Sequence, residues 1–309
     1  MSRNYGISRN LDVAGRIVLT NAAKNGAISF GSAARLIQSW NKFSAFAVKE
    51  GVKKMETITR ELVKKFGSQE AERVREGTLS ASSSQNSVSA VNTVLRLVPE
   101  KHWQSVSPRK DCGISARSNV RETAPASETT YQQTLEALSE RPREAALVQL
   151  CREFGLRSEE ASLLHVRTAL RHAEAKGEIR VTLGTKGGRT RVVPIAAPER
   201  QIPALKAACE AAEKSINLIP REKTYVQWRE GAMRHARDCA IEHGASGLHD
   251  FRAAYACARY EQITEKNAPA IAGTRQVEKS IDKAARVTVS HELGHGRIDV
   301  TVSYLGSAK

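Results

Sequence analysis

The chain has 309 residues, of which 40% are hydrophobic, and its 48 Lys+Arg against 33 Asp+Glu give a formal net charge of +15. This composition excludes a disordered chain, and the longest apolar run, residues 145–151, is far shorter than the roughly 18 residues of a membrane-spanning helix. At about 150 residues per domain, the length predicts two domains.

The positive charge is concentrated in the amino-terminal part of the chain. Residues 1–122 hold 20 Lys+Arg and 10 Asp+Glu, whereas residues 123–309 hold 28 and 23. A field of this sign attracts phosphate backbones or anionic lipid, and nucleic acid is the commoner partner of a basic protein without a lipid anchor. Composition therefore favours DNA or RNA as the partner, and a charge that serves solubility alone is the alternative.

Cysteine usage and the polar amino terminus indicate a cytoplasmic protein. Five cysteines are an odd number without C-x-x-C spacing, which argues against a disulfide framework and against a clustered cysteine zinc site. They are Cys112, Cys151, Cys209, Cys239 and Cys257. We expect reduced, mostly buried thiols. No apolar core follows the first five residues, so the sequence predicts no secretory signal.

Apolar residues recur at helical spacing from Val13 to Phe66 and predict a bundle of short helices, with Gly51 and Gly67 at helix ends. The recurring positions include Leu36, Trp40, Phe43, Met55, Ile58 and Leu62. The serine-rich run 80–87 is predicted as a loop that supplies an N-cap to one more helix, which begins near Val88. We expect this helical domain to cover residues 1–104.

Residues 105–127 have the composition of an exposed, cationic linker. They contain Pro108, Pro125 and several basic side chains, but few large apolar residues. We expect this segment to be the hinge between the helical domain and a second domain over residues 128–309.

The second domain is predicted to be mostly α with a small β-sheet. It opens with one helix that ends at Gly155, a residue type suited to a helix C-terminus. The apolar residues of this helix are Leu135, Leu138, Leu147, Leu150, Cys151 and Phe154. Residues 179–183 and 191–195 alternate apolar and polar around the glycine-rich turn 184–188, which predicts a β-hairpin. Helical spacing returns at 226–236 and 248–260. The expected fold class is therefore mainly α with a small β-sheet (α+β).

An ordered set of basic residues, histidines and one tyrosine runs through the second domain. His249 and Arg252 are three residues apart, hence on one face of a helix, but chance alone gives about one such pair in this composition. The pattern becomes more specific when the other residues of the set are included. The other members are Arg157 with Glu160 at a helix start, Lys186 in the glycine-rich turn, His295 in a Leu-Gly-His triplet, and Tyr304.

In this order the set resembles the tyrosine recombinase/integrase family, whose phage-type integrases share a catalytic fold with type IB topoisomerases. The resemblance covers residues 128–309 and implies a tyrosine recombinase catalytic domain, while the first domain looks like the family's helical core-binding domain by pattern and charge. It implies a site-specific recombinase that integrates or excises a mobile element such as a prophage.

The resemblance also implies partners and residue roles. The partners are double-stranded DNA at the nucleoid, further copies of the chain as a dimer on each site and a tetramer in the synapse, and accessory DNA-bending proteins. The catalytic residues it implies are Arg157, Lys186, His249, Arg252, His295 and the nucleophile Tyr304, with Glu160 in support.

The chemistry of strand transfer requires these residue types. A free tyrosine has a pKa near 10, so forming the phenolate at pH 7 costs about 4 kcal/mol. Two guanidiniums, from Arg157 and Arg252, would hold the phosphate oxygens bidentately. We expect Lys186 to protonate the leaving 5′ oxygen, His249 to deprotonate Tyr304, and His295 to donate a hydrogen bond to the phosphate. The resulting 3′-phosphotyrosyl bond conserves energy, so no cofactor, neither ATP nor metal, is expected.

Alternative explanations remain for the single members of the set. Arg157 and Glu160 could form an exposed surface bridge worth about 0–1 kcal/mol, Lys186 could be a solvated turn residue, and Tyr304 could be a packing residue. A DNA-binding protein that keeps the fold without catalysis is the second hypothesis. The stretch from Arg252 to His295 is longer than in many relatives, and the charged segment 261–286 within it has no assigned role.

A third hypothesis comes from residues 291–295, which read H-E-x-x-H, the helical zinc-ligand pair and glutamate base of metalloproteases. Positions 298 and 301, where a third ligand could follow, are Ile and Thr, and the only acid nearby is Asp299. We therefore expect no zinc hydrolase here and no metal site.

Overall fold

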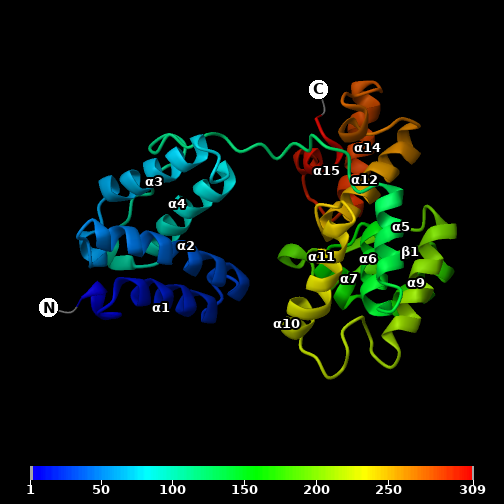
Figure 1. Ribbon diagram of the computed structural model, residues 1–309, viewed down its shortest axis with the longest axis horizontal. Helices are drawn as coiled ribbons and strands as arrows, with labels where there is room; N and C mark the ends of the chain where they lie inside the picture. The colour runs from blue at the N-terminus through cyan, green and yellow to red at the C-terminus, as the bar shows by residue number, and fades with distance from the viewer. Residues whose placement is uncertain (1–2, 308–309) are drawn as a thin grey trace. The chain divides into compact units, whose positions relative to one another are not determined.

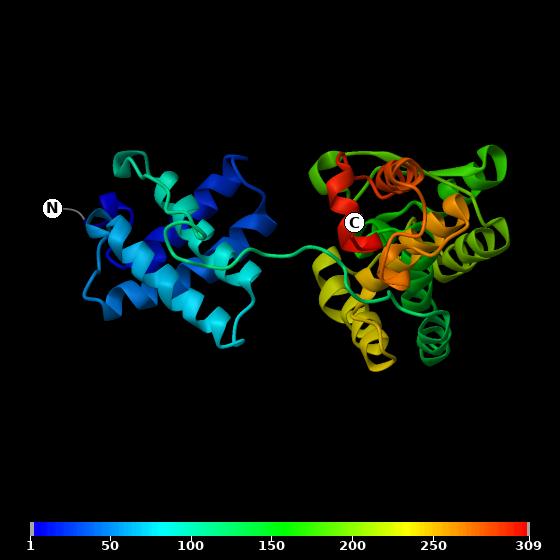
Figure 2. The same ribbon diagram turned by 90° about the horizontal axis from the view of Figure 1, so that it is seen from above.

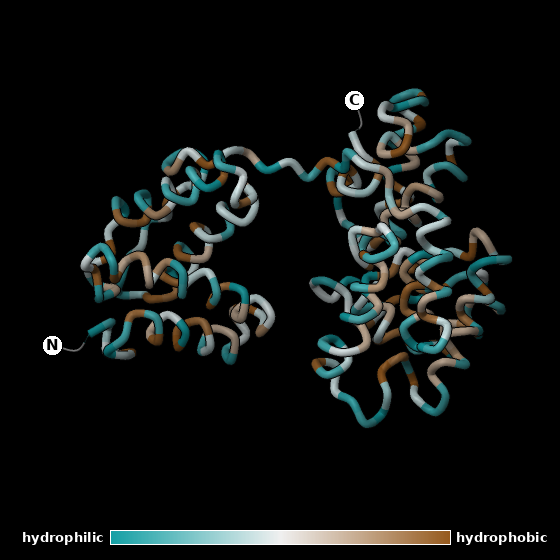
Figure 3. The backbone as a smooth tube through the Cα atoms, viewed as in Figure 1, coloured by the Kyte–Doolittle hydropathy of each residue, from teal (hydrophilic) through white to brown (hydrophobic). Residues whose placement is uncertain are grey.

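The computed structural model describes residues 3–307, which form two compact domains that divide between Ser118 and Asn119. The division falls within the predicted linker, and each domain is described by itself below (Figures 1 and 2). Hydrophobic and hydrophilic residues alternate within the turns of many helices, as the changing colour of the backbone trace shows (Figure 3).

In its described residues, 3–118, the first domain is a bundle of four helices with three short 3₁₀ turns. The helices are α1 (Leu11–Lys24), α2 (Phe30–Lys49), α3 (Arg60–Arg75) and α4 (Ala81–Arg96), and the turns are Asn4–Gly6, Met55–Thr57 and Pro99–Lys101. Three helices begin with a side-chain cap, in which the hydroxyl oxygen of the N-cap residue accepts from a free backbone N–H of the first turn. The N-cap residues are Ser29, Thr59 and Ser80. The apolar faces of the helices meet at Trp40 and Phe43, which are fully buried.

Two details of this domain differ from the sequence prediction. Gly67 lies inside α3 and not at a helix end. A glycine is needed there because α3 and Cys112 approach so closely that an added Cβ would collide with the Cys112 Sγ. The serine run is helical from Ala81 onward, and only Ser80 acts as the predicted N-cap. Ser87 Oγ donates to the Ser83 carbonyl at 3.1 Å, so the serine side chains bond within the helix and do not end it.

The predicted linker, residues 105–127, contains neither helix nor strand. Its first part nevertheless packs on the first domain, where Val106, Cys112 and Ile114 are buried in the core. Asn92 fixes its course by accepting from the Val106 N–H at 2.9 Å. The exposed connection is therefore shorter than composition suggests.

The second domain contains eleven helices and one two-stranded sheet among the described residues. The elements are α5 (Glu128–Ala137), α6 (Pro142–Phe154), α7 (Ser158–Leu163), α8 (Val166–Lys176), β1 (Glu178–Val181), β2 (Arg191–Pro194), α9 (Pro198–Ala212), α10 (Tyr225–Trp228), α11 (Arg234–Glu242), α12 (Leu248–Thr264), α13 (Pro269–Ala272), α14 (Lys279–Glu292) and α15 (Val302–Leu305). A π-helical turn, Arg229–Met233, joins α10 to α11, and 3₁₀ turns cover Lys186–Gly188 and Ile298–Thr301.

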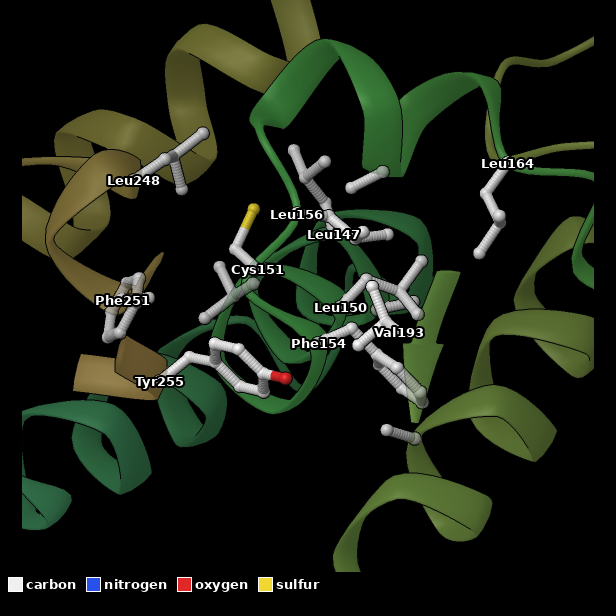
Figure 4. Packing of buried hydrophobic residues seen from close by; sticks show 14 of the residues in the cluster. Leu147, Leu150, Cys151, Phe154, Leu156, Leu164, Val193, Leu248, Phe251 and Tyr255 are labelled. Carbon is white, nitrogen blue, oxygen red and sulfur yellow. The ribbon is translucent and has the colours of Figure 1, made fainter. Parts of the chain in front are cut away.

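Helix α6 is the centre of the second core and contacts α9 and α12. Its side chains Leu147, Leu150, Cys151 and Phe154 are fully buried, and Figure 4 shows how they pack together. The sequence predicted one helix across residues 135–154, but two are present, because Pro142 restricts Arg141 to non-helical dihedrals and starts α6 anew. Gly155 ends α6 with φ 58°, as predicted.

Strands β1 and β2 pair antiparallel and form the predicted hairpin, with Ile179 opposite Val193 and Val181 opposite Arg191. The observed fold, mainly helical with this one small sheet, confirms the predicted class. None of the described helices is long and apolar enough to cross a membrane. All five cysteines are free thiols, and four of them are buried.

The charged segment 261–286 is folded into the end of α12, α13 and the start of α14. Within it, Arg286 and Asp282 form a buried ion pair at 2.9 Å, and Arg286 Nη1 also donates to the Gly306 carbonyl at 3.1 Å. The segment therefore holds the chain on the carboxyl side of α15, which lies beside α12 (Figures 1 and 2).

Candidate active site

Arg252 lies at the centre of the predicted site and has no exposed surface. Helix α12 presents it to the carboxyl end of α6, where one terminal nitrogen donates to the Gly155 carbonyl. The other donates to the Leu293 carbonyl at 2.5 Å, and Nε donates to the Tyr304 hydroxyl at 3.3 Å. A single guanidinium thus joins three segments that are far apart in the sequence. Burial is the main cause that lowers the pKa of Arg252, to about 10.

Tyr304 and His295 meet beside this guanidinium. His295 Nε2 lies 3.2 Å from the Tyr304 hydroxyl oxygen and 3.4 Å from Arg252 Nη2. Because an arginine nitrogen can only donate, Nε2 must be the unprotonated ring nitrogen and therefore accepts from the tyrosine hydroxyl. Burial, followed by the charge of Arg252, lowers the pKa of His295 to about 3, which keeps the imidazole neutral near pH 7.

The fully buried carboxylate of Glu160 lies beside Arg157 and Arg252. It accepts from the Arg157 backbone N–H at 2.7 Å and from Arg157 Nη1 at 2.6 Å, and Arg252 Nη1 lies 3.7 Å from it. The backbone contact closes the first turn of α7, so Glu160 also fixes where Arg157 begins the helix. The ion pair of Arg157 and Glu160 is therefore not the exposed surface bridge that was the alternative explanation for these two residues.

Arg191 is a member of this network that the sequence reasoning missed. Its two terminal nitrogens donate to the two Glu160 carboxylate oxygens at 2.8 and 2.6 Å, and its Nε donates to the Glu292 carbonyl at 2.8 Å. Burial alone would raise the pKa of Glu160, but the hydrogen bonds and charge of Arg191 lower it to about 2. The alternation along the strand could have indicated that Arg191 is buried. Val193 faces the core, and the side chain of Arg191, two positions earlier, lies on the same face of the strand.

His249 lies in the first turn of α12 with one edge exposed to solvent. Its ring centroid is 5.3 Å from that of Tyr304, yet no hydrogen bond between the two side chains is present in residues 3–307. Partial desolvation, followed by the charges of Arg252 and Arg157, holds the pKa of His249 below its usual range. Of the two imidazoles, His295 is thus the one in hydrogen-bonding contact with the Tyr304 hydroxyl.

Lys186 is the predicted site residue that the structure does not bring to the others. It is exposed in the 3₁₀ turn between β1 and β2, and no hydrogen bond or ion pair joins it to the remaining site residues in the described part of the chain. The base of the hairpin is nevertheless fixed beside the site. Gly184 packs on the backbone of α7, and Arg189 lies against Gly296, one residue after His295.

The residues of the H-E-x-x-H sequence do not form a metal centre. Helix α14 ends at Glu292, so His291 and His295 do not lie on one helix. The Glu292 carboxylate is buried and already accepts from Tyr255 at 2.7 Å and from Arg259 at 2.7 Å. Within residues 3–307, no cluster of three or more His, Cys, Asp or Glu residues is suited to a metal ion.

An open pocket borders His249 on the side of the π-helical turn. Three arginines line it, Arg229, Arg234 and Arg237, together with Ser158 at the start of α7. Glu230 and Asp238 pair with these arginines, and all three arginine side chains are about half exposed. The pocket is a basic surface beside the exposed edge of an imidazole, an arrangement suited to an anionic phosphate backbone.

Comparison with known proteins found one family model and several solved structures that are similar to this chain. Residues 113–258 match the integrase family. A crystal structure of a lambda integrase dimer bound to a COC′ core site has the same fold at 16% identity, with a TM-score of 0.58 over 94% of this chain and 76% of that one.

Two further solved structures share the fold. A lambda integrase tetramer bound to a Holliday junction has a TM-score of 0.56 at 16% identity, covering 94% of this chain and 76% of that one. The Tn1549 transposon integrase in complex with transposon right end DNA has a TM-score of 0.59 at 11% identity, covering 96% and 95%. No curated protein sequence matches the chain.

Proposed function

We propose that this chain is a member of the tyrosine recombinase/integrase family, a site-specific recombinase that cuts and rejoins double-stranded DNA through Tyr304. The observation that carries the proposal is the position of the Tyr304 hydroxyl, 3.3 Å from Arg252 Nε and 3.2 Å from His295 Nε2. A phenol between a guanidinium and a neutral imidazole has both a base for its proton and a cation for the phosphate that it attacks.

The reaction is a transfer of one phosphodiester bond. The Tyr304 oxygen attacks the scissile phosphorus, the P–O5′ bond breaks, and a 3′-phosphotyrosyl enzyme and a free 5′ hydroxyl result. The guanidiniums of Arg157 and Arg252 neutralise the charge that develops on the phosphate oxygens. The reverse attack by a 5′ hydroxyl restores the DNA, so the energy of the broken bond is retained and neither ATP nor a metal is required.

The proton transfers are assigned from the contacts. His295 is the base for the Tyr304 hydroxyl, because its Nε2 is in contact with that oxygen. Burial and the charge of Arg252 lower the pKa of His295, and the negative charge of a bound phosphate offsets the second of these, so the imidazole becomes a stronger base when DNA is bound. This assignment reverses the division of roles expected from the sequence, in which His249 took the proton. His249, with its exposed edge, donates to the phosphate instead. Lys186 protonates the leaving 5′ oxygen once the hairpin turn closes on DNA.

The substrate enters from the basic pocket beside His249. Arg252 and Tyr304 are almost completely buried, whereas His249 and the arginines of the pocket are open to solvent. A DNA backbone that lies along Arg229, Arg234 and Arg237 brings its phosphates to this exposed wall of the site. Binding must then open the contact between Tyr304 and Arg252 to admit the scissile phosphate.

The natural partners are DNA and further copies of this chain. The lambda integrase structures with this fold are a dimer on a core site and a tetramer on a Holliday junction, and we extend both assemblies to this protein. Integration or excision of a mobile element such as a prophage is the task that fits such an enzyme. It would act on the nucleoid in the cytoplasm, with accessory DNA-bending proteins as a further class of partner.

Covalent trapping tests the proposal. The full chain is incubated with a pool of nicked duplexes that covers the DNA flanking its gene, and protein-bound fragments are recovered after denaturation and sequenced. The wild type should yield a covalent adduct at one site, with EDTA present and without ATP. Tyr304→Phe should yield none, whereas Tyr5→Phe, in the first domain, should behave like the wild type. DNA binding without any adduct would leave a non-catalytic DNA-binding protein.

A further inference from the structure

Arg121, three residues after the division between the domains, contacts two parts of the candidate active site. Its backbone N–H donates to the Val302 carbonyl at 2.9 Å, and its guanidinium pairs with the carboxylate of Asp250. Val302 begins α15, which carries Tyr304, and Asp250 lies between His249 and Arg252 in α12. In Figure 1 the connecting segment runs beside α15 before it reaches α5.

The pair of Arg121 and Asp250 is not an ordinary surface bridge. The side chains are only 14% and 5% exposed, so their attraction is little screened by water. Arg121 Nε also donates to the Thr123 carbonyl at 2.9 Å, which holds the segment in a turn. The second Asp250 oxygen accepts from the Ser246 N–H at 3.0 Å, which holds the approach to α12.

Helix α15 needs such contacts because it has only four residues. A helix of this length has no stability of its own, so the position of Tyr304 depends on what anchors the helix from outside. Arg286 anchors its carboxyl side through the Gly306 carbonyl, and Cys257 Sγ lies 3.5 Å from the Tyr304 carbonyl. The bond from Arg121 to Val302 anchors its amino end.

We propose that Arg121 is a positioning residue for the nucleophile: it ties the segment between the domains to α15 and α12, and so sets the Tyr304 hydroxyl against Arg252. The inference rests on the proposed function of Tyr304 and adds a route by which the connecting segment acts on it. A change in the course of residues 119–124 moves the Tyr304 helix and the start of α12 together. Misplacement of a reacting group by about 1 Å costs about 100-fold in rate.

The first test needs no DNA. Hydrogen exchange of the full chain is measured for the wild type, Arg121→Ala, Arg121→Lys and Arg117→Ala, an exposed neighbour whose loss removes the same charge. Arg121→Ala keeps the backbone N–H that donates to Val302 but removes the pair with Asp250 that holds this backbone in place. It should therefore raise exchange in peptides that cover residues 298–307 and leave those of α6 and α9 unchanged. Arg121→Lys keeps the charge next to Asp250 and should restore part of the protection, while Arg117→Ala should match the wild type.

The second test measures the rate of adduct formation on the trapped site in single turnover, with DNA affinity measured beside it. Arg121→Ala should lower the rate about 10- to 100-fold at saturating DNA, with an affinity equal to that of Arg117→Ala. Asp250→Asn should lower the rate as well, and the double variant should be no slower than the slower single variant, because the two residues act as one pair.

Several results would overturn the positioning role. Unchanged exchange at residues 298–307 in Arg121→Ala would do so, as would increased exchange across the whole second domain, which indicates a purely structural residue. Fully additive effects of the two single variants would also count against it. If the wild type formed no adduct, the proposed function would fail, while the exchange experiment would still decide whether Arg121 holds α15.

Discussion

The Glu160 carboxylate accepts hydrogen bonds from both terminal nitrogens of Arg191, Nη1 at 2.8 Å and Nη2 at 2.6 Å, although 31 positions separate the two residues. The pair joins α7 to β2, and through Arg157 it reaches the edge of the site. A buried ion pair with this geometry contributes little net stability compared with an apolar pair, but removing one partner leaves the other charge buried and uncompensated.

We therefore predict that Arg191→Met lowers the free energy of unfolding by about 3–5 kcal/mol. Urea unfolding measures it, with the second domain followed through the fluorescence of Trp228, whose Nε1 donates to Ser162 on α7 at 2.9 Å. Arg189→Met changes the same charge at an exposed position of the hairpin and should cost less than about 1 kcal/mol. Equal losses in the two variants would contradict a buried pair.

Acid should destabilise the second domain through two groups whose pKa values are lowered by folding. The pKa of Glu160 falls from 4.5 to about 2 and that of His295 from 6.5 to about 3, so the unfolded chain binds more protons than the folded one. The stability that each group contributes is complete above its unfolded pKa and is lost as pH falls towards its folded pKa. Unfolding free energy should therefore decrease from about pH 6.5 downward.

Urea midpoints between pH 7 and 3 check this dependence. The difference between the wild type and His295→Gln should change across this range, because glutamine has no proton to take up. His291→Gln, four residues earlier on the exposed side of α14, should run parallel to the wild type. A parallel profile for His295→Gln as well would refute the low pKa of His295.

The two imidazoles should differ in their effect on DNA cleavage. His295 contacts the Tyr304 hydroxyl and His249 does not, so His295→Gln should slow adduct formation about 10²- to 10⁴-fold, the usual contribution of a general base. His249→Gln should slow it less. Single-turnover rates at saturating DNA measure both, and the opposite order would return the role of base to His249.

Lys186 should matter only when the leaving group needs a proton. Lys186→Ala should slow cleavage of the natural P–O5′ bond about 10²- to 10⁴-fold. A substrate with sulfur in place of the bridging 5′ oxygen leaves as a thiolate, with a pKa near 8.5, and should be cleaved at the wild-type rate by this variant. Lys176→Ala, exposed on α8, is the matched control. An equal defect on both substrates would indicate a role in binding instead.

DNA binding should depend on salt in proportion to the phosphates that the basic pocket contacts. Each contact contributes about −0.9 to the slope of log affinity against log salt concentration. Arg234→Gln and Arg237→Gln should each reduce the magnitude of the slope by about 0.9 if their side chains reach a phosphate. Arg171→Gln, exposed on α8, should leave the slope unchanged. Affinity independent of salt would exclude an electrostatic grip on the backbone.

Most of the residues that meet at the candidate site were named from the sequence, but two arginines that pack around them were not. The order of Arg157, Lys186, His249, Arg252, His295 and Tyr304 is readable as a motif, and the family resemblance added Glu160 to it. Arg191 and Arg121 were missed, because an arginine in a strand or in a basic segment looks like surface charge until its partner is known. Gly67 was wrongly expected at a helix end, because the sequence does not show the close approach of Cys112 that requires a glycine inside the helix.

The sequence by itself determined the features that depend on neighbours a few positions away. Examples are the hydroxyl cap at Ser80, the left-handed glycine at 155, the start of α6 at Pro142 and the alternation of the hairpin strands. Local dihedrals and short-range hydrogen bonds fix these, whatever surrounds them. The tertiary structure alone decided which charges are buried together, such as Arg121 with Asp250 over 129 positions. Removing a charge from water is favourable only where a partner from another element completes it, so such pairs exist only once the elements have packed.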